Sequence, residues 1–184
     1  MLFFYVHGFS SSARSRKGQA LKRLLSGHRV VGLEYPYPPD EAARTLLSQA
    51  EAAGAGSEPC VFVGSSLGGL YTRYLLTQFD AKAVLINPVV RADLMRALIG
   101  PVTNYYTGAT YEWREEDVRA LARYDTPLAG PALVLLDEGD EVLDYRMAVA
   151  AYEDVADVIV FPGGNHEFAH LEESIPLITR FAAE

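Results

Sequence analysis

Residues 61–70 read Val-Phe-Val-Gly-Ser-Ser-Leu-Gly-Gly-Leu, and this stretch decides the expected fold. Its apolar start predicts a buried strand, and the residues from Ser66 to Phe79 repeat apolar side chains with a helical period. Ser66 lies between Gly64 and Gly68 on a sharp strand-to-helix turn, where a Cβ at either glycine position would have no room. Ser66 is therefore predicted to project above the sheet as a nucleophile.

On both sides of this motif, short apolar runs alternate with amphipathic stretches. Further strands are expected at 2–6, 29–33, 83–86, 133–136 and 158–161, with helices between most of them. Repeated strand–helix units predict a parallel sheet with helices on both faces. With 184 residues, the chain is expected to form one domain over 1–184. The predicted fold class is α/β, with a trimmed, mostly parallel sheet of about six strands.

The alternation of strands and helices fails once, between Pro88 and Pro131. A helix at 91–99, an aromatic loop and a charged helix at 114–122 are expected there. An insertion after a strand lies over the crevice where α/β sheets bind ligands, so residues from about 89 to 130 are interpreted as a lid. The alternative is a second small core pinned to the scaffold. The aromatic residues of this insertion, which fit both interpretations, are Tyr105, Tyr106, Tyr111 and Trp113.

A serine nucleophile needs a general base and a carboxylate that orients the base. His166 follows the last expected strand in a glycine-containing loop that allows it to reach the serine. Asp140 lies a few residues beyond the strand at 133–136 and precedes an apolar pair, so it is the preferred acid. Asp137 and Asp144 are the alternatives. The chain order of serine, acid and histidine is typical of α/β hydrolases.

The tetrahedral intermediate of such a reaction carries an oxyanion that requires hydrogen-bond donors. The backbone N–H of Leu67, at the start of the helix, is one expected donor. The N–H of Phe9, in the loop after the first strand, is the other. His7 is interpreted as a brace of this loop, with substrate contact as the alternative. No cluster of His, Cys and Asp has the spacing of metal ligands, so neither a metal nor another cofactor is predicted.

The composition limits the classes of partner. The formal net charge of −8 disfavours nucleic acid and anionic membranes. The single cysteine, Cys60, excludes an intrachain disulfide. No apolar stretch is long enough for a membrane span and the N-terminus does not resemble a signal peptide, so a cytoplasmic location is expected. One basic cluster is interpreted as a solvated helix face or as a landing patch for an anionic substrate tail; it comprises Arg14, Arg16, Lys17, Lys22 and Arg23.

Further segments are more distinctive than the nucleophile turn alone. They are Tyr-Val-His-Gly-Phe-Ser-Ser-Ser at 5–12, Glu-Tyr-Pro-Tyr-Pro-Pro at 34–39, Val-Gly-Ser-Ser-Leu-Gly-Gly at 63–69, Asn-Pro-Val-Val-Arg at 87–91, Tyr-Thr-Gly at 106–108, Gly-Asp-Glu-Val-Leu-Asp-Tyr-Arg at 139–146 and Gly-Gly-Asn-His-Glu-Phe at 163–168. Together, and in this order, they resemble the small bacterial YqiA-like esterases. The resemblance implies a single-domain α/β hydrolase that cleaves short acyl esters, or acyl-coenzyme A thioesters, with Ser66, Asp140 and His166 as its triad.

Several other polar residues lie where a substrate would bind. Asn87 and Arg91 follow the fourth strand, and Tyr145 and Arg146 follow the acid. All four are expected to anchor loops, and the alternative for either arginine is to hold a substrate carboxylate or phosphate. Two aromatic residues of the lid are further candidates for substrate contact; they are Tyr105 and Tyr106.

The sequence therefore predicts a serine ester hydrolase that acts on a small-molecule acyl ester or thioester of short to medium length. Two other functions use the same scaffold. One is a lyase or synthase in which the same three residues abstract a proton, and the other is a binding protein without catalysis. The motifs predict neither the acyl length nor the oligomeric state.

Overall fold

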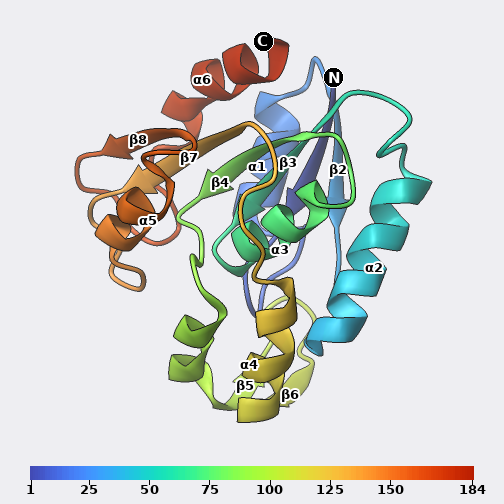
Figure 1. Cartoon of the computed structure of the whole chain (residues 1–184), viewed down its shortest axis with the longest axis vertical. Helices are drawn as coiled ribbons and strands as arrows, with labels where there is room; N and C mark the ends of the chain where they lie inside the picture. Colours follow the sequence, from blue (N-terminus) through green and yellow to red (C-terminus); the bar gives the residue numbers. More distant parts are fainter.

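The computed structural model describes all residues of the chain, 1–184, and its centre is one parallel sheet (Figure 1). The strands of this sheet are β1 (Leu2–Val6), β2 (Arg29–Leu33), β3 (Cys60–Ser65), β4 (Lys82–Ile86), β7 (Ala132–Asp137) and β8 (Asp157–Phe161). Their order is β2-β1-β3-β4-β7-β8, and every neighbouring pair runs parallel. The six strands expected from the apolar runs are therefore confirmed.

The strand order reverses once, at β1. The chain moves from β1 to β2 on one side and then returns to place β3 on the other side of β1. Such a switch point opens a crevice at the carboxyl ends of the two central strands. The loop after β1 and the loop after β3 therefore lie next to each other, and the second of them carries Ser66.

Helices cover both faces of the sheet (Figure 1), while the edge strands β2 and β8 stay partly exposed. The helices are α1 (Arg16–Leu24), α2 (Pro39–Ala52), α3 (Leu67–Leu76), α4 (Glu115–Leu121), α5 (Tyr145–Tyr152) and α6 (Leu171–Ala183), with the 3₁₀ segments η1 (Ala92–Leu98) and η2 (Ala122–Tyr124). α1 and α6 pack on one face of the sheet, and α2, α3 and α5 pack on the other. Because β1, β3 and β7 are buried along their whole length, they read as continuous apolar runs rather than as alternating ones.

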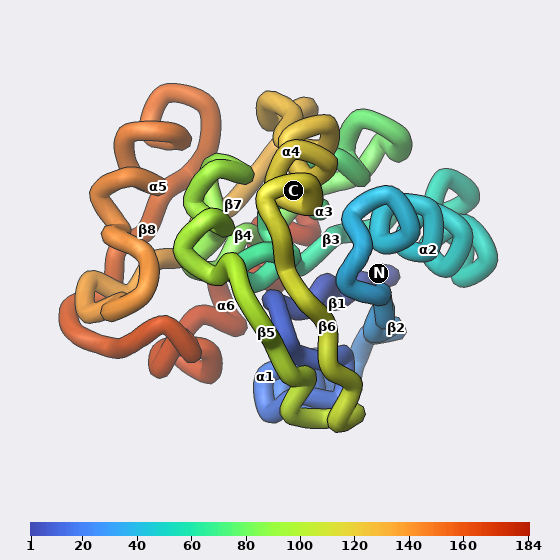
Figure 2. Tube along the Cα trace, turned by 90° about the horizontal axis from the view of Figure 1, so that it is seen from below, coloured from blue at the N-terminus to red at the C-terminus, as the bar shows by residue number.

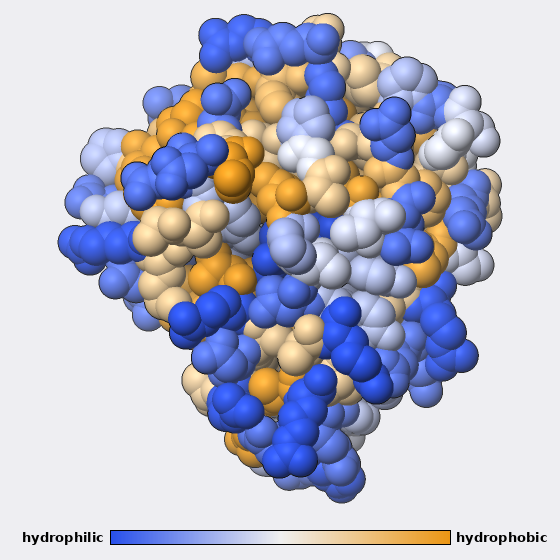
Figure 3. Space-filling view, in the orientation of Figure 1, coloured by the Kyte–Doolittle hydropathy of each residue, from blue (hydrophilic) through white to orange (hydrophobic).

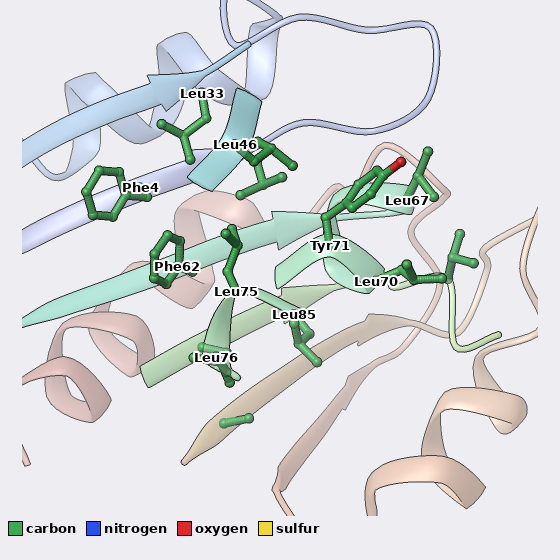
Figure 4. Packing of buried hydrophobic residues seen from close by; sticks show 14 of the residues in the cluster. Phe4, Leu33, Leu46, Phe62, Leu67, Leu70, Tyr71, Leu75, Leu76 and Leu85 are labelled. Atoms are coloured by element: carbon green, nitrogen blue, oxygen red, sulfur yellow. The ribbon is translucent and has the colours of Figure 1, made fainter. Parts of the chain in front are cut away.

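The larger of the two apolar cores fixes α3 against the sheet (Figure 4). Phe4 of β1 and Phe62 of β3 are fully buried, and their rings stack with centroids 4.9 Å apart. Leu70, Tyr71 and Leu75 of α3 lie over them without exposure to solvent. Each such side chain contributes about 1.5–3 kcal/mol through burial. This packing holds the turn between β3 and α3 in place.

The inserted segment contains a β-hairpin that the sequence interpretation missed. β5 (Gly100–Thr103) and β6 (Thr110–Trp113) pair antiparallel where an aromatic loop was expected, and the expected helix at 91–99 is the 3₁₀ segment η1. Val102 and Tyr111 pair across the hairpin, as β-branched and aromatic residues do in strands. In Figure 2 the hairpin extends along the underside of the molecule towards α1, and Asn104 near its tip donates to the carbonyl of Ser11 over 2.7 Å.

The base of the insertion is part of the larger apolar core. Trp113 is fully buried, its indole N–H donates to the carbonyl of Met95, and its ring meets Phe9 edge-on at 5.0 Å. Tyr105, at the tip of the hairpin, is in contrast 90% exposed. The aromatic residues of the insertion therefore divide into buried ones at its base and exposed ones at its tip.

Both ends of the insertion are tied to α3 by one buried arginine. Arg73 donates to the carbonyls of Val90 (3.2 Å) and Thr126 (2.7 Å), at the beginning and at the end of the inserted segment. It also pairs with the carboxylate of Asp125 at 2.8 Å, and that carboxylate accepts the N–H of Ala92. The guanidinium fork thus joins the two ends of the insertion at one point.

The surface around α4 is strongly hydrophilic (Figure 3). Glu115 there pairs with Arg96 at 2.6 Å and with Arg119 at 3.5 Å. None of the helices combines the length and the apolar character that crossing a lipid bilayer requires.

Candidate active site

Ser66 lies at the sharp turn between β3 and α3 with a backbone that few L-residues adopt. Its φ is +54° and its ψ is −122°. The flanking glycines are sterically required, because a Cβ at Gly64 would overlap Thr72 and a Cβ at Gly68 would overlap the carbonyl of Val6. Strained backbone of this kind persists only where the surrounding structure holds it, and it is common at sites of function. The turn presents the Ser66 hydroxyl at the carboxyl edge of the sheet.

The structure brings His166 and Asp140 together with this serine. The Nε2 atom of His166 lies 3.1 Å from the Ser66 Oγ, and its Nδ1 lies 2.9 and 3.0 Å from the two carboxylate oxygens of Asp140. With its hydrogen on Nδ1, the imidazole donates to Asp140 and accepts the Ser66 hydroxyl. A continuous chain of hydrogen bonds therefore connects residues that are far apart in the sequence.

Asp140 is held as a carboxylate by its surroundings. Its side chain is only 2% exposed, and its Oδ1 accepts the backbone N–H groups of Val142 and Leu143, each over 2.9 Å. Burial alone would raise the pKa of Asp140, but the hydrogen bonds from His166, Leu143 and Val142 outweigh it and keep the pKa below its ordinary value. The group is thus suited to orient and stabilise a protonated imidazole.

Two polar residues at the strand ends fix the loop that carries His166. Asn87, directly after β4, has a φ of +41°, donates to the carbonyls of Asn165 (3.0 Å) and His166 (3.3 Å), and accepts the N–H of Asp137. Asp137 is fully buried and accepts the N–H groups of Asn165 and Ala169 and the Nδ1–H of the His170 ring, over 2.6–3.1 Å. The sequence interpretation considered Asp137 as an alternative acid. Its position at the end of a buried strand was the sequence signal that could have indicated this role.

The loop after β1 passes directly beside the serine. A Cβ added to Gly8 would lie 3.2 Å from the Ser66 Cβ, so only glycine fits without displacement. The N–H of Phe9 has no acceptor within the protein. Leu67 is the first residue of α3, where a helix leaves its N–H groups without partners. Both of the sequence-predicted donor segments therefore flank the Ser66 side chain.

A cavity of about 400 Å³ lies over the serine and the histidine. One part of its lining is apolar and comes from the β4–η1 segment and the loop after β7. The other part is polar and comes from β1, α1 and β3. Tyr105 and Tyr106 of the hairpin tip complete the wall, as the sequence interpretation expected of them. The apolar lining includes Val89, Leu94, Met95, Leu98 and Leu143, and the polar lining includes Tyr5, Ser15, Lys17, Ser65 and Glu167.

His7, Arg91 and Arg146, for which substrate contact was the alternative to a bracing or anchoring role, do not line this cavity. His7 is 3% exposed and stacks on Tyr35 with ring centroids 4.2 Å apart, and its Nε2 lies 3.4 Å from a carboxylate oxygen of Glu34. It therefore braces the loop. Arg91 pairs with its near neighbour Asp93, and Arg146 with Asp144. Both arginines turn outward because an acceptor lies within two residues along the chain. Lys17, which was assigned to the surface cluster, lies in the cavity instead.

The side chains that could ligate metals form no cluster. Nowhere do three or more His, Cys, Asp or Glu side chains converge in an arrangement that could hold a metal ion.

Known proteins resemble the chain over almost its whole length. The model of an uncharacterised protein family, UPF0227, matches residues 2–183. An ethyl acetate hydrolase from Pseudomonas putida is 30% identical over an alignment of 178 residues that covers 80% of this chain and 56% of that protein. The chain thus spans little more than half of that relative's length. A UPF0227 protein from Vibrio atlanticus (strain LGP32) is 20% identical over 183 residues, and 98% of each chain is covered.

The solved structures agree in fold. Est1E from Butyrivibrio proteoclasticus, with ferulic acid bound, aligns with 100% of this chain and 90% of its own at a TM-score of 0.79 and 14% identity. At this identity the likeness concerns the fold alone. The fold is that of the α/β hydrolases, as the sequence predicted.

Proposed function

The chain belongs to the UPF0227 family, the YqiA-like family that its motifs resemble, and from this premise we propose that it is a serine carboxylic-ester hydrolase. Ser66 is the nucleophile, His166 the general base and Asp140 the acid that orients the base. The observation that carries the proposal is the connected geometry, with 3.1 Å from Ser66 Oγ to His166 Nε2 and 2.9 Å from His166 Nδ1 to Asp140. The name of the Pseudomonas relative, an ethyl acetate hydrolase, supports the same reaction class.

In the first half of the reaction, the Ser66 Oγ attacks the carbonyl carbon of the ester while His166 Nε2 takes the hydroxyl proton. The resulting imidazolium is stabilised by Asp140, whose carboxylate accepts the Nδ1–H. The tetrahedral intermediate then collapses, His166 returns the proton to the departing alcohol, and the acyl group remains on Ser66.

In the second half, water enters in place of the alcohol. His166 takes a proton from the water as its oxygen attacks the acyl carbon, and the proton passes back to the Ser66 Oγ when the acid leaves. In both halves the N–H groups of Phe9 and Leu67 donate to the oxyanion. The free N–H of Phe9 beside Gly8 supports this role. Each such donor contributes about 3–4 kcal/mol to the stability of the transition state.

Residues 89–130 act as a lid in this proposal. η1 supplies the apolar wall of the cavity and the hairpin tip supplies two tyrosines. A cavity of about 400 Å³ with such a wall accommodates an acyl group of short to medium length. Acyl-coenzyme A thioesters are the second substrate class within the same mechanism, because a thiol replaces the alcohol as the leaving group.

A hydrolysis panel tests the proposal. Wild-type protein is assayed with p-nitrophenyl esters and acyl-coenzyme A thioesters of graded length, and Ser66→Ala is expected to lower kcat by about 10⁴-fold or more. Ser57→Ala, at an exposed site at the opposite end of the sheet, is the matched control. A fluorophosphonate should label Ser66, as read by mass spectrometry of the peptide. Full activity of Ser66→Ala, or an unlabelled Ser66 in an active enzyme, would disprove the mechanism.

A further inference from the structure

Lys17 is a buried cation without a carboxylate partner. It lies in the first turn of α1, is 9% exposed, and its Nζ donates to the Oγ of Ser65 over 2.6 Å. No carboxylate oxygen lies within 4.0 Å of this ammonium, although many other cations of the chain are paired in this way. The other members of the basic cluster are exposed; they are Arg14, Arg16, Lys22 and Arg23. The cluster is therefore not one surface, because Lys17 has turned inward.

The buried ammonium of Lys17 lacks hydrogen-bond acceptors and a counter-charge. An ammonium has three N–H donors, and the Ser65 hydroxyl satisfies one of them. Burial of a charge without a counter-charge is costly, since the lost hydration is not replaced. Accordingly, burial lowers the pKa of Lys17 to about 8, although Glu167, Asp140 and Asp137 act against this shift. A negatively charged group bound next to Lys17 would supply the counter-charge and the hydrogen-bond acceptors that the folded chain does not provide.

The location of Lys17 indicates where that negative group would come from. Lys17 and Ser65 line the same cavity as Ser66 and His166, and Ser65 directly precedes the nucleophile in the chain. The N-terminus of α1 faces the same region, with Ser15 as its N-cap. The positive end of that helix favours an anion as well. Helix and lysine thus give the polar end of the cavity a positive character close to the reacting atoms.

We propose that Lys17 and Ser65 form an anion subsite and that the preferred substrates are esters whose own small acyl or alcohol part carries a carboxylate. The inference rests on the proposed hydrolysis and adds the substrate class to it. The charged arm of the substrate binds Lys17, and the apolar wall at Leu94 and Leu98 takes the other arm.

Glu167 offers the competing explanation. It is an acidic side chain in the lining of the same cavity, and its charge favours the protonated form of Lys17. If Glu167 were the working partner of Lys17, a charge on the substrate would give no advantage. The two explanations therefore differ in the ratio of specificity constants for charged and neutral esters.

The test compares matched esters at pH 7. The kcat/KM values of the half-esters ethyl hydrogen succinate, glutarate and adipate are measured against ethyl butyrate by titration of the acid released. We expect at least one half-ester to exceed ethyl butyrate by about tenfold or more, the scale of a charge-assisted hydrogen bond. In Lys17→Met this ratio should fall by about tenfold or more. Lys22→Met removes the same charge from the exposed face of α1 and should leave the ratio unchanged.

Two further measurements keep the test decisive. Ser65→Ala removes the partner of Lys17 and should lower the ratio in the same direction, should Lys17→Met fail to fold. In the Ser66→Ala background, calorimetry measures binding of the half-esters without catalysis, and Lys17→Met should weaken it by about tenfold.

The outcomes separate the subsite from the hydrolysis. Half-esters that bind through Lys17 but are not hydrolysed by the wild type would support the subsite and refute the esterase. Hydrolysis of neutral esters without a charge preference, or an equal loss for both classes in Lys17→Met, would refute the subsite alone.

Discussion

Asp137→Asn and Asp140→Asn each replace one carboxylate oxygen by an NH₂ group, at positions three residues apart. We expect the two substitutions to affect different properties of the protein. Asp140 contacts the imidazole of His166, whereas Asp137 holds the backbone of the loop that carries it. Asp140→Asn should therefore lower catalysis, and Asp137→Asn should lower stability.

The magnitudes follow from the contacts. Asn at 140 presents an NH₂ group or an uncharged oxygen to His166 Nδ1, so the tautomer that accepts the Ser66 proton loses its support. The expected loss is about 10³–10⁴-fold in kcat, or about 4–5 kcal/mol in the barrier. Asn at 137 retains an oxygen for the N–H groups of Asn165 and Ala169 but loses the charge. Each bond then weakens by about 1 kcal/mol, which gives about 2 kcal/mol in the free energy of unfolding.

The assays are kcat with a butyrate ester and Tm by circular dichroism. For a chain of this size, 2 kcal/mol corresponds to a fall in Tm of about 4–8 °C. Asp137→Asn should show this fall with kcat within about tenfold of wild type. Asp140→Asn, which also weakens two backbone hydrogen bonds, should lose kcat by about 10³-fold or more whatever its Tm. A thousandfold loss of kcat in Asp137→Asn at unchanged Tm would refute the assignment of the two carboxylates. Wild-type activity in Asp140→Asn would do the same.

Four further outcomes are expected. Gly8→Ala should lower kcat by about tenfold or more, because its Cβ at 3.2 Å from the Ser66 Cβ displaces the donor loop; kinetics at saturating ester measure this. Arg73→Met should lower the free energy of unfolding by about 3–5 kcal/mol in urea, since it leaves the partly buried carboxylate of Asp125 and two carbonyls without their donor. Lys17 has a depressed pKa of about 8, so between this pH and the ordinary pKa of 10.5 the unfolded chain binds more protons than the folded chain. The free energy of unfolding should therefore rise by about 1 kcal/mol per pH unit over this range. Urea unfolding of Lys17→Met should show a flatter dependence on pH. Tyr105→Ala, at a 90% exposed site, should change stability by less than about 0.5 kcal/mol while it raises KM for the ester, and an unchanged KM would place the tyrosine outside the substrate path.

The scaffold was predictable because its signals are local. An apolar strand, a glycine-flanked serine and an amphipathic helix follow one another within one short segment at 61–79, and steric limits on the two glycines leave few alternatives. The inner strands were found for the same reason, since parallel strands that are buried on both faces read as unbroken apolar runs, and the partly exposed edge strands β2 and β8 still carry short β-branched runs.

The hairpin was not predictable in the same way. Its strands have four residues each, and Pro101 argues against a strand in the sequence. Pro101 is tolerated because the two-stranded sheet has open edges. The buried Trp113, which pins the hairpin to the main core, has no periodic pattern around it.

The polar contacts were harder to predict because they depend on the direction in which each side chain turns in the folded chain. Arg91 and Arg146 were candidates for substrate binding, yet each pairs with an acid two residues away. Lys17 stands among exposed cations in the sequence, and only the packing of α1 shows that it points inward. A charge count cannot separate one buried cation from its solvated neighbours.

The arginine that joins both ends of the insertion has a consequence for how the family can diversify. Because the inserted segment leaves the scaffold and returns to it at Arg73, its two anchor points remain fixed whatever lies between them. Such a segment can be lengthened, shortened or exchanged between relatives as a cassette without a change in the register of β4 and β7. Substrate selection by the inserted segment can then vary between relatives without a change in the catalytic residues of the scaffold.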